Sequence, residues 1–109
     1  MDTVALRYAE ALFALAKEEN AIKQYQKDME AVEVVFHDKS ILQFFSHVAI
    51  QDEDKYQVLK QSFQGKIQTY VYQFLLLLIK KRRIQCILLI CQQFQQLCYD
   101  ALGIQVGKV

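Results

Sequence analysis

The chain has 109 residues, 53% of them hydrophobic, with no proline, no tryptophan and only three glycines. This length suits one domain, and the shortage of turn-forming residues argues against a β-rich fold, so the sequence predicts an all-α protein. The formal net charge is +1, but residues 1–54 carry a net charge of −6 and residues 55–109 carry +7. An acidic half packed against a basic half in one fold is the simplest explanation, and a half that faces nucleic acid or a membrane is the alternative.

Residues 3–19, TVALRYAEALFALAKEE, form the first expected helix, and their apolar residues cover more of its surface than one core contact requires. At about 100° per residue, the charged side chains fall in one narrow stripe. The stripe expected to face the core is Ala5, Ala9, Leu12 and Ala16. A second apolar stripe, rotated to one side, is Val4, Tyr8, Ala11 and Leu15. Because a small domain easily buries only one such stripe, the second is either buried as well or a docking surface for another helix.

Five more helices are predicted from apolar residues at three-to-four spacing between polar end signals. In chain order they span residues 21–36, 41–47, 52–64, 67–81 and 84–102. Side chains that cap a helix start and residues that tolerate a left-handed backbone at its end mark these limits. They are Thr3, Asn20, Ser40, Asp52, Gly65 and Gly103.

The last two helices are the most apolar. The helix at 67–81 is apolar almost all round, and its expected core side is Val71, Phe74, Leu75 and Leu78. The final helix directs a glutamine-rich face outward, and its expected inward residues are Ile84, Ile87, Leu88, Cys91, Phe94, Leu97, Cys98 and Ala101. The sequence therefore predicts a compact six-helix bundle over residues 1–103. Residues 104–109 have the pattern of a short extended tail, the start of a strand or linker toward a further domain.

The cysteines Cys86, Cys91 and Cys98 are odd in number and have no paired spacing, so they do not describe a disulfide framework. We expect reduced thiols that pack as small hydrophobes on the inner or flanking side of the last helix. His37 and His47 stand alone, without the convergent titratable groups that acid–base catalysis needs. We therefore assign no catalytic residue and expect a protein that is not an enzyme.

The sequence contains no complete motif for binding a phosphate group or a metal ion. Gly65-Lys66 lacks the first glycine and the Ser or Thr of a phosphate-binding loop. The acids at 52–54 precede an apolar helix, whose dipole they complement, so no metal or cofactor is assigned. The apolar run 74–79 is too short to span a bilayer, and the N-terminus does not resemble a signal peptide, so neither membrane insertion nor export is expected.

Three segments, in order, resemble a known family. VALRYAEALFALAKEE is similar to the first helix of the N-terminal domain of the F-type ATP synthase delta subunit, whose mitochondrial counterpart is the oligomycin-sensitivity-conferring protein. YQFLLLLIKKRRI resembles that family's Asn-Phe-Leu-x-Leu-Leu helix and basic turn, and FQQLCYDALGIQVGKV resembles its last helix and the strand that follows. The resemblance spans the whole chain and agrees with six helices.

The resemblance implies a non-catalytic stator (peripheral stalk) component that supports proton-driven ATP synthesis. It implies that this domain is a monomer in isolation, binds the N-terminal helix of an alpha subunit at the top of the catalytic head, and reaches the peripheral stalk b subunit through a C-terminal domain. The implied location is peripheral, on the cytoplasmic face of the cell membrane as part of the complex. Carried over by position, the alpha helix would lie between the first and fifth helices, against Val4, Tyr8, Ala11, Leu15, Gln73, Leu76, Leu77, Lys80 and Lys81.

The chain departs from the family in two places. The turn before the last helix usually carries an asparagine and a glycine followed by arginine, whereas this chain has Lys81, Arg82 and Arg83. That turn must form without glycine's tolerance of a positive φ. The prolines that commonly flank the short third helix are also missing, which leaves the shape of residues 37–52 open.

The alternative function is a basic helical module that binds nucleic acid or an anionic membrane surface. It would rest on the cluster 80–83 together with Lys55, Lys60 and Lys66. These cations lack the interleaved aromatic residues that a strand-binding groove needs, so we expect no nucleic acid among the partners.

Overall fold

The computed structural model describes residues 3–103, and this part of the chain is all-α, as predicted. Its helices are α1 (Thr3–Glu18), α2 (Ile22–Phe36), α3 (Lys39–Ser46), α4 (Asp52–Phe63), α5 (Thr69–Lys80), the short 3-10 helix η1 (Ile84–Cys86) and α6 (Ile87–Leu102). The predicted six-helix bundle is therefore confirmed. The expected extended tail, residues 104–109, lies outside the described residues, so the division of the chain at residue 103 stays a prediction.

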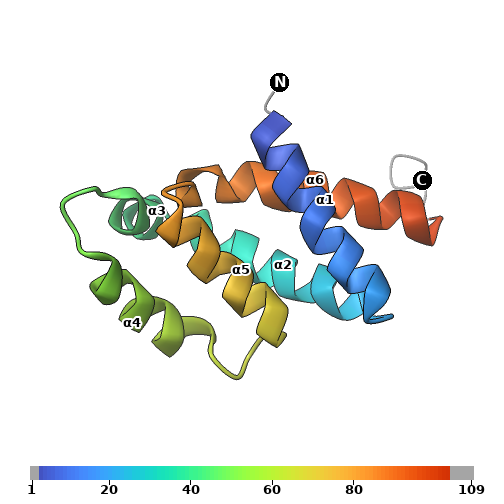
Figure 1. The fold of residues 1–109 in the computed structure, drawn as a ribbon, viewed down its shortest axis with the longest axis horizontal. Coiled ribbons are helices and arrows are strands. Elements are labelled where there is room, and N and C mark those ends of the chain that lie inside the picture. Colours follow the sequence, from blue (N-terminus) through green and yellow to red (C-terminus); the bar gives the residue numbers. More distant parts are fainter. Residues whose placement is uncertain (1–2, 104–109) are drawn as a thin grey trace.

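The bundle is built around α6, which packs along both α1 and α2. Figure 1 shows α1 crossing α6, with α5 beside α1 and α4 at the outer edge of the molecule. α4 packs mainly against α5, and α3 packs near the connection between α5 and α6. No helix within residues 3–103 is long and apolar enough to cross a membrane.

The core stripe predicted on α1 is confirmed. Its four residues, Ala5, Ala9, Leu12 and Ala16, are all 0% exposed. Three of them are alanines, and small side chains at a helix contact allow the two axes to approach closely. This is why α1 lies directly against α6. On α5, the four predicted core residues are buried as well.

Two of the predicted helix stops are confirmed by backbone angles: Asn20 has φ 55° and Gly103 has φ 72°, in the left-handed region that ends a helix. Gly65 also has a left-handed φ of 80°, but α4 has already ended before it, at Gln64, whose φ of −61° and ψ of 130° are extended. Lys81 also leaves the helical conformation after α5, and Arg82 follows it with φ 59°. Arg82 therefore adopts, without being glycine, the conformation for which a glycine would be expected at this turn.

The helix starts differ from the predictions in several places. Thr3, expected to be a cap, lies within α1, and α2 starts at Ile22 rather than at residue 21. Asp38 caps α3, because its side chain accepts a hydrogen bond of 2.9 Å from the backbone N–H of Ser40, the residue expected to be the cap. α4 begins with Asp52 itself, and Gln51 occupies the cap position without a side-chain bond. α5 begins at Thr69 rather than at residue 67. The backbone N–H of Gln68 donates to Asp28 Oδ2 at 2.7 Å, so α2 holds the point where α5 starts.

The last helix also differs in detail from its predicted pattern. Residues 84–86 form a 3-10 turn before α6, and Ala101, expected inward, is exposed. Gln95, expected on the outer face, is only 8% exposed, and its Nε2 donates to the backbone carbonyl of Gln26 at 3.2 Å. A glutamine can occupy this buried position because its amide replaces part of the hydration it loses.

The cysteines are free thiols, and two of the three are buried as predicted. Burial raises the pKa of the Cys91 thiol to about 12 and that of the Cys98 thiol to about 11. Cys86 is only partly covered. Thiols with raised pKa values are poor nucleophiles at neutral pH, which fits a packing role for Cys91 and Cys98.

Candidate docking groove

A groove of about 420 Å³ runs between α1 and α5. It brings together the second apolar stripe of α1 and one side of α5. Its lining residues are Tyr8, Ala11, Leu12, Leu15, Tyr70, Gln73, Phe74 and Leu77. None of the eight carries a formal charge, so this surface is suited to an apolar partner rather than to a charged ligand.

The floor of the groove belongs to the hydrophobic core. Leu12 is fully buried and Phe74 is 8% exposed. The rings of Tyr8 and Phe74 meet edge to face, with centroids 6.0 Å apart and planes at 70°. Tyr8 is therefore in contact with α5 through this ring pair.

The rim of the groove consists of large side chains left in solvent. Leu77 is 40% exposed and Tyr70 is 42% exposed, and they lie seven residues apart on the same side of α5. Across the groove, the small side chain of Ala11 is exposed on α1. The small side chain of Ala11 on α1 leaves a slot opposite the larger side chains of Leu77 and Tyr70 on α5. A side chain of a visiting helix would fit into this slot.

One end of the groove is basic. Figure 1 shows α1 and α5 running in opposite directions, so the start of α1 lies near the end of α5. A hollow of about 320 Å³ at this end is lined by Val4, Arg7, Tyr8, Ala11 and Arg83. The guanidinium carbon of Arg83 lies 5.9 Å from the centre of the Tyr8 ring, within range of a cation–π interaction.

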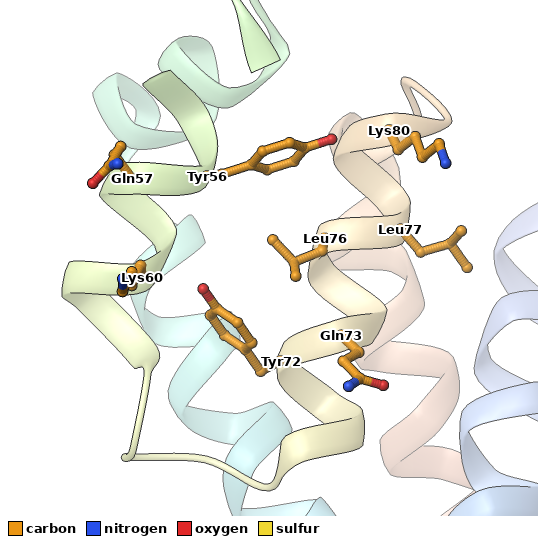
Figure 2. Close-up of a pocket in the computed structure, with 8 residues that line it drawn as sticks. All are labelled: Tyr56, Gln57, Lys60, Tyr72, Gln73, Leu76, Leu77 and Lys80. Carbon is orange, nitrogen blue, oxygen red and sulfur yellow. The ribbon is translucent and has the colours of Figure 1, made fainter. Parts of the chain in front are cut away.

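A second pocket, of about 440 Å³, lies on the other side of α5, against α4. Figure 2 shows its lining residues, Tyr56, Gln57, Lys60, Tyr72, Gln73, Leu76, Leu77 and Lys80. Leu76 points toward α4 and is half-buried, whereas Leu77 points toward the α1 side of the helix. Burial, and next the carboxylates of Asp52 and Glu53, raise the pKa of Tyr56, so its hydroxyl stays protonated at neutral pH.

The structure therefore divides the predicted docking residues. Five of them line the groove between α1 and α5: Tyr8, Ala11, Leu15, Gln73 and Leu77. Val4 lines the adjoining basic hollow. Leu76 and Lys80 line the pocket toward α4 and are not part of the groove. Lys81 is exposed and lines neither the groove nor these two hollows.

Sequence reasoning missed three residues that surround the groove. Tyr70 could have been found, because it lies three residues before Gln73 and seven before Leu77 on one helical side. Arg7 was assigned only to the charged stripe of α1, although it borders the basic hollow. Arg83 had no signal in the sequence, since its position over Tyr8 depends on the turn that follows α5.

The described residues offer no group of three or more His, Cys, Asp or Glu side chains that could hold a metal ion. Between residues 3 and 103, the one basic and acidic side-chain pair within 4 Å is His37 Nε2 and Glu33 Oε2, at 3.7 Å. Among the residues that the structure describes, no ion pair joins the acidic half to the basic half. The groove can bury the apolar surface of a partner, and cations lie at one of its ends.

A sequence model of the ATP synthase delta (OSCP) subunit family matches residues 4–109. The chain is 34% identical over 99 residues to "ATP synthase subunit delta" of Halalkalibacterium halodurans, an alignment that covers 90% of this chain and 54% of that protein. It is 35% identical over 103 residues to the subunit of the same name from Thermosynechococcus vestitus, covering 94% and 56% of the two chains. The chloroplastic delta subunit of Gracilaria tenuistipitata var. liui is 30% identical over 110 residues, covering 100% and 60%.

The chain thus spans little more than half the length of the curated relatives it matches. The family match nevertheless covers all of the chain except its first three residues. The chain belongs to the ATP synthase delta (OSCP) subunit family.

Proposed function

We propose that this chain is the part of an ATP synthase stator that binds the N-terminal helix of an alpha subunit, and that it does so in the groove between α1 and α5. The observation that carries the proposal is the uncharged groove over Ala11, with Leu77 and Tyr70 exposed on its rim. An amphipathic helix buries its apolar face in such a surface through side chains spaced three and four residues apart. Exposed leucine and tyrosine side chains gain from this burial because water is displaced from both partners.

The basic end of the groove suggests the direction in which the helix lies. Arg7 and Arg83 border the hollow at the start of α1. The C-terminal end of a helix carries partial negative charge, and cations nearby stabilise it. We therefore place the C-terminal end of the alpha helix, or an acidic side chain near that end, beside Arg83.

In this proposal the chain is non-catalytic and acts mechanically. By binding the alpha subunit it would hold the catalytic head against torque, while a C-terminal domain would connect it to the b subunit of the peripheral stalk. The complex would place it peripherally at the cytoplasmic face of the cell membrane, in support of proton-driven ATP synthesis.

The test is the binding of a synthetic peptide with the sequence of the alpha-subunit N-terminus from the same source. Ala11→Trp fills the slot over α1 and should weaken binding at least about tenfold, or about 1.4 kcal/mol. Ala14→Trp is the matched control, because Ala14 is exposed on the same helix but does not line the groove. Equal binding by both variants and the parent chain would rule out this groove.

The basic-module alternative predicts a different response to salt. The cations of the 80–83 cluster do not form one continuous stripe, since Arg83 lies over Tyr8 and Lys80 lines the pocket toward α4. A nucleic acid bound through phosphates would lose affinity steeply as salt rises. A helix held in an apolar groove should change little over the same range.

A further inference from the structure

A separate cavity of about 220 Å³ lies where the end of α3, the start of α4, the turn after α5 and η1 meet. Its lining residues are Phe45, Ser46, Val48, Lys55, Ile79, Arg82, Ile84 and Gln85. The cavity is about seven times the roughly 30 Å³ that one water molecule occupies in the liquid. It shares none of these residues with the α1–α5 groove. Two of the lining residues are cations, and none is an acid.

The central feature of this cavity is Lys55, which is only 3% exposed. Within residues 3–103, the Lys55 ammonium group has no ion pair and no hydrogen bond to the protein. Its Nζ atom is not among the buried side-chain atoms without a hydrogen-bond partner, so the stem of Lys55 is covered while its ammonium group reaches solvent. Asp52 lies one turn earlier on α4, but it does not line the cavity and its carboxylate is not within ion-pair distance of the ammonium group. The charge of Lys55 is therefore not ion-paired within residues 3–103 and is accessible to an anion from solution.

Three further side chains supply hydrogen-bond donors to the same cavity. The Ser46 hydroxyl is buried and has no hydrogen-bond partner among the described residues. Arg82 brings a guanidinium group, and Gln85 brings an amide. Arg82 holds this position with φ 59°, a conformation that is unfavourable for a residue with a side chain. Four donors, two of them charged, are the chemistry that recognises an oxyanion.

We propose that this cavity binds a phosphate-class oxyanion, with Lys55 and Arg82 supplying the charge and Ser46 and Gln85 supplying hydrogen bonds. A tetrahedral oxyanion offers several acceptor oxygens to these four groups at once. Lys55 lines this cavity together with Ile79 of α5 and Ile84 of η1, and in the proposal its ammonium group binds the anion.

The experiment is a titration of the full 109-residue chain with inorganic phosphate, followed by amide chemical shifts. Sodium phosphate replaces sodium chloride at constant ionic strength, so general screening does not change. The expected result is a saturable shift at the amides of Ser46 and Gln85. A parallel titration with O-phosphoserine shows whether the site prefers the free ion or a phosphoryl group on a side chain, and a saturable response to either supports an oxyanion site.

Two variants and one control make the test decisive. Lys55→Met keeps most of the apolar stem, and Arg82→Gly removes the guanidinium while relieving the positive φ, so both should fold. Each should weaken the response at least about tenfold, the loss expected for a charge-assisted hydrogen bond. Lys60→Met, an exposed lysine on the same helix, should leave it unchanged. The proposal is overturned by an absent or non-saturable response, by equal weakening in Lys60→Met, or by Lys55→Met and Arg82→Gly binding like the parent chain.

Discussion

The positive φ of Arg82 determines where the side chains of Arg82 and Arg83 lie. This angle turns the chain between α5 and η1, so that Arg82 lines the cavity beside α3 while Arg83 lies over Tyr8. In a continuous helix the four consecutive cations at 80–83 would instead point in directions about 100° apart around one axis. The turn separates them, which is why the charge cluster visible in the sequence is not a single charged surface in the fold.

Cys91 gives a prediction at the same scale. Its pKa is raised from an ordinary value of 9.0 to about 12 by burial. The unfolded chain therefore loses the thiol proton before the folded chain does, and stability should fall as pH rises above 9. Between pH 8 and pH 10 the parent chain should lose about 1.4 kcal/mol more unfolding free energy than Cys91→Ala, which lacks the thiol. Urea unfolding at both pH values measures this, and parallel losses in the two chains would contradict it.

At the scale of elements, α1 and α5 differ in how well the sequence predicts their faces. On α1, charged residues confine the apolar surface, and alanine and leucine at three-to-four spacing identify the core stripe correctly. On α5, apolar residues surround nearly the whole helix, because it packs against α4 on one side and borders the groove on the other. The period of the sequence does not decide between two apolar sides, so it could not show that Leu76 lines the pocket toward α4 rather than the groove.

The ends of the helices also differ in how well the sequence predicts them. Asn20 and Gly103 are recognisable because few residues tolerate a positive φ, so their identity alone predicts a stop. The starts of α3 and α5 were less predictable. The cap of α3 could be either of two neighbouring polar residues, and the start of α5 depends on a hydrogen bond from Gln68 to Asp28, 40 residues earlier. Contacts between distant segments leave no local signal.

That contact leads to a prediction for α5. Burial raises the pKa of Asp28, although the hydrogen bond from Gln68 partly opposes the rise. A raised pKa in the folded state means that the charge of Asp28 is unfavourable there, so Asp28→Asn, which keeps an acceptor oxygen, should be at least as stable as the parent. Asp28→Ala leaves the Gln68 N–H without its partner and should cost about 1 kcal/mol. Urea unfolding of the two variants checks this, and an Ala variant as stable as the Asn variant would contradict it.

At the scale of the whole molecule, the core and the groove are separable surfaces on the same two helices. Leu12 is 0% exposed beneath the groove, whereas Leu77 is 40% exposed on its rim. Leu12→Asp would bury a charge without a partner, a change that can remove about 4–5 kcal/mol, comparable to the total stability of a small domain. We expect its helical circular dichroism signal to be largely lost at 25 °C. A cooperative thermal transition like that of the parent chain would show that Leu12 is not a core residue in solution.

The most direct measurement of the central claim compares Leu77→Asp with the parent chain in calorimetric titration with the alpha-subunit N-terminal peptide. Val34→Asp is the control, because Val34 is 74% exposed on α2, far from the groove in sequence and not among its lining residues. The account predicts that Leu77→Asp keeps the circular dichroism spectrum and thermal transition of the parent but binds the peptide at least about tenfold more weakly, since its carboxylate must be desolvated under an apolar helix. Val34→Asp should bind like the parent. Parent-like affinity in Leu77→Asp, or equal weakening in both variants, would contradict a docking groove between α1 and α5.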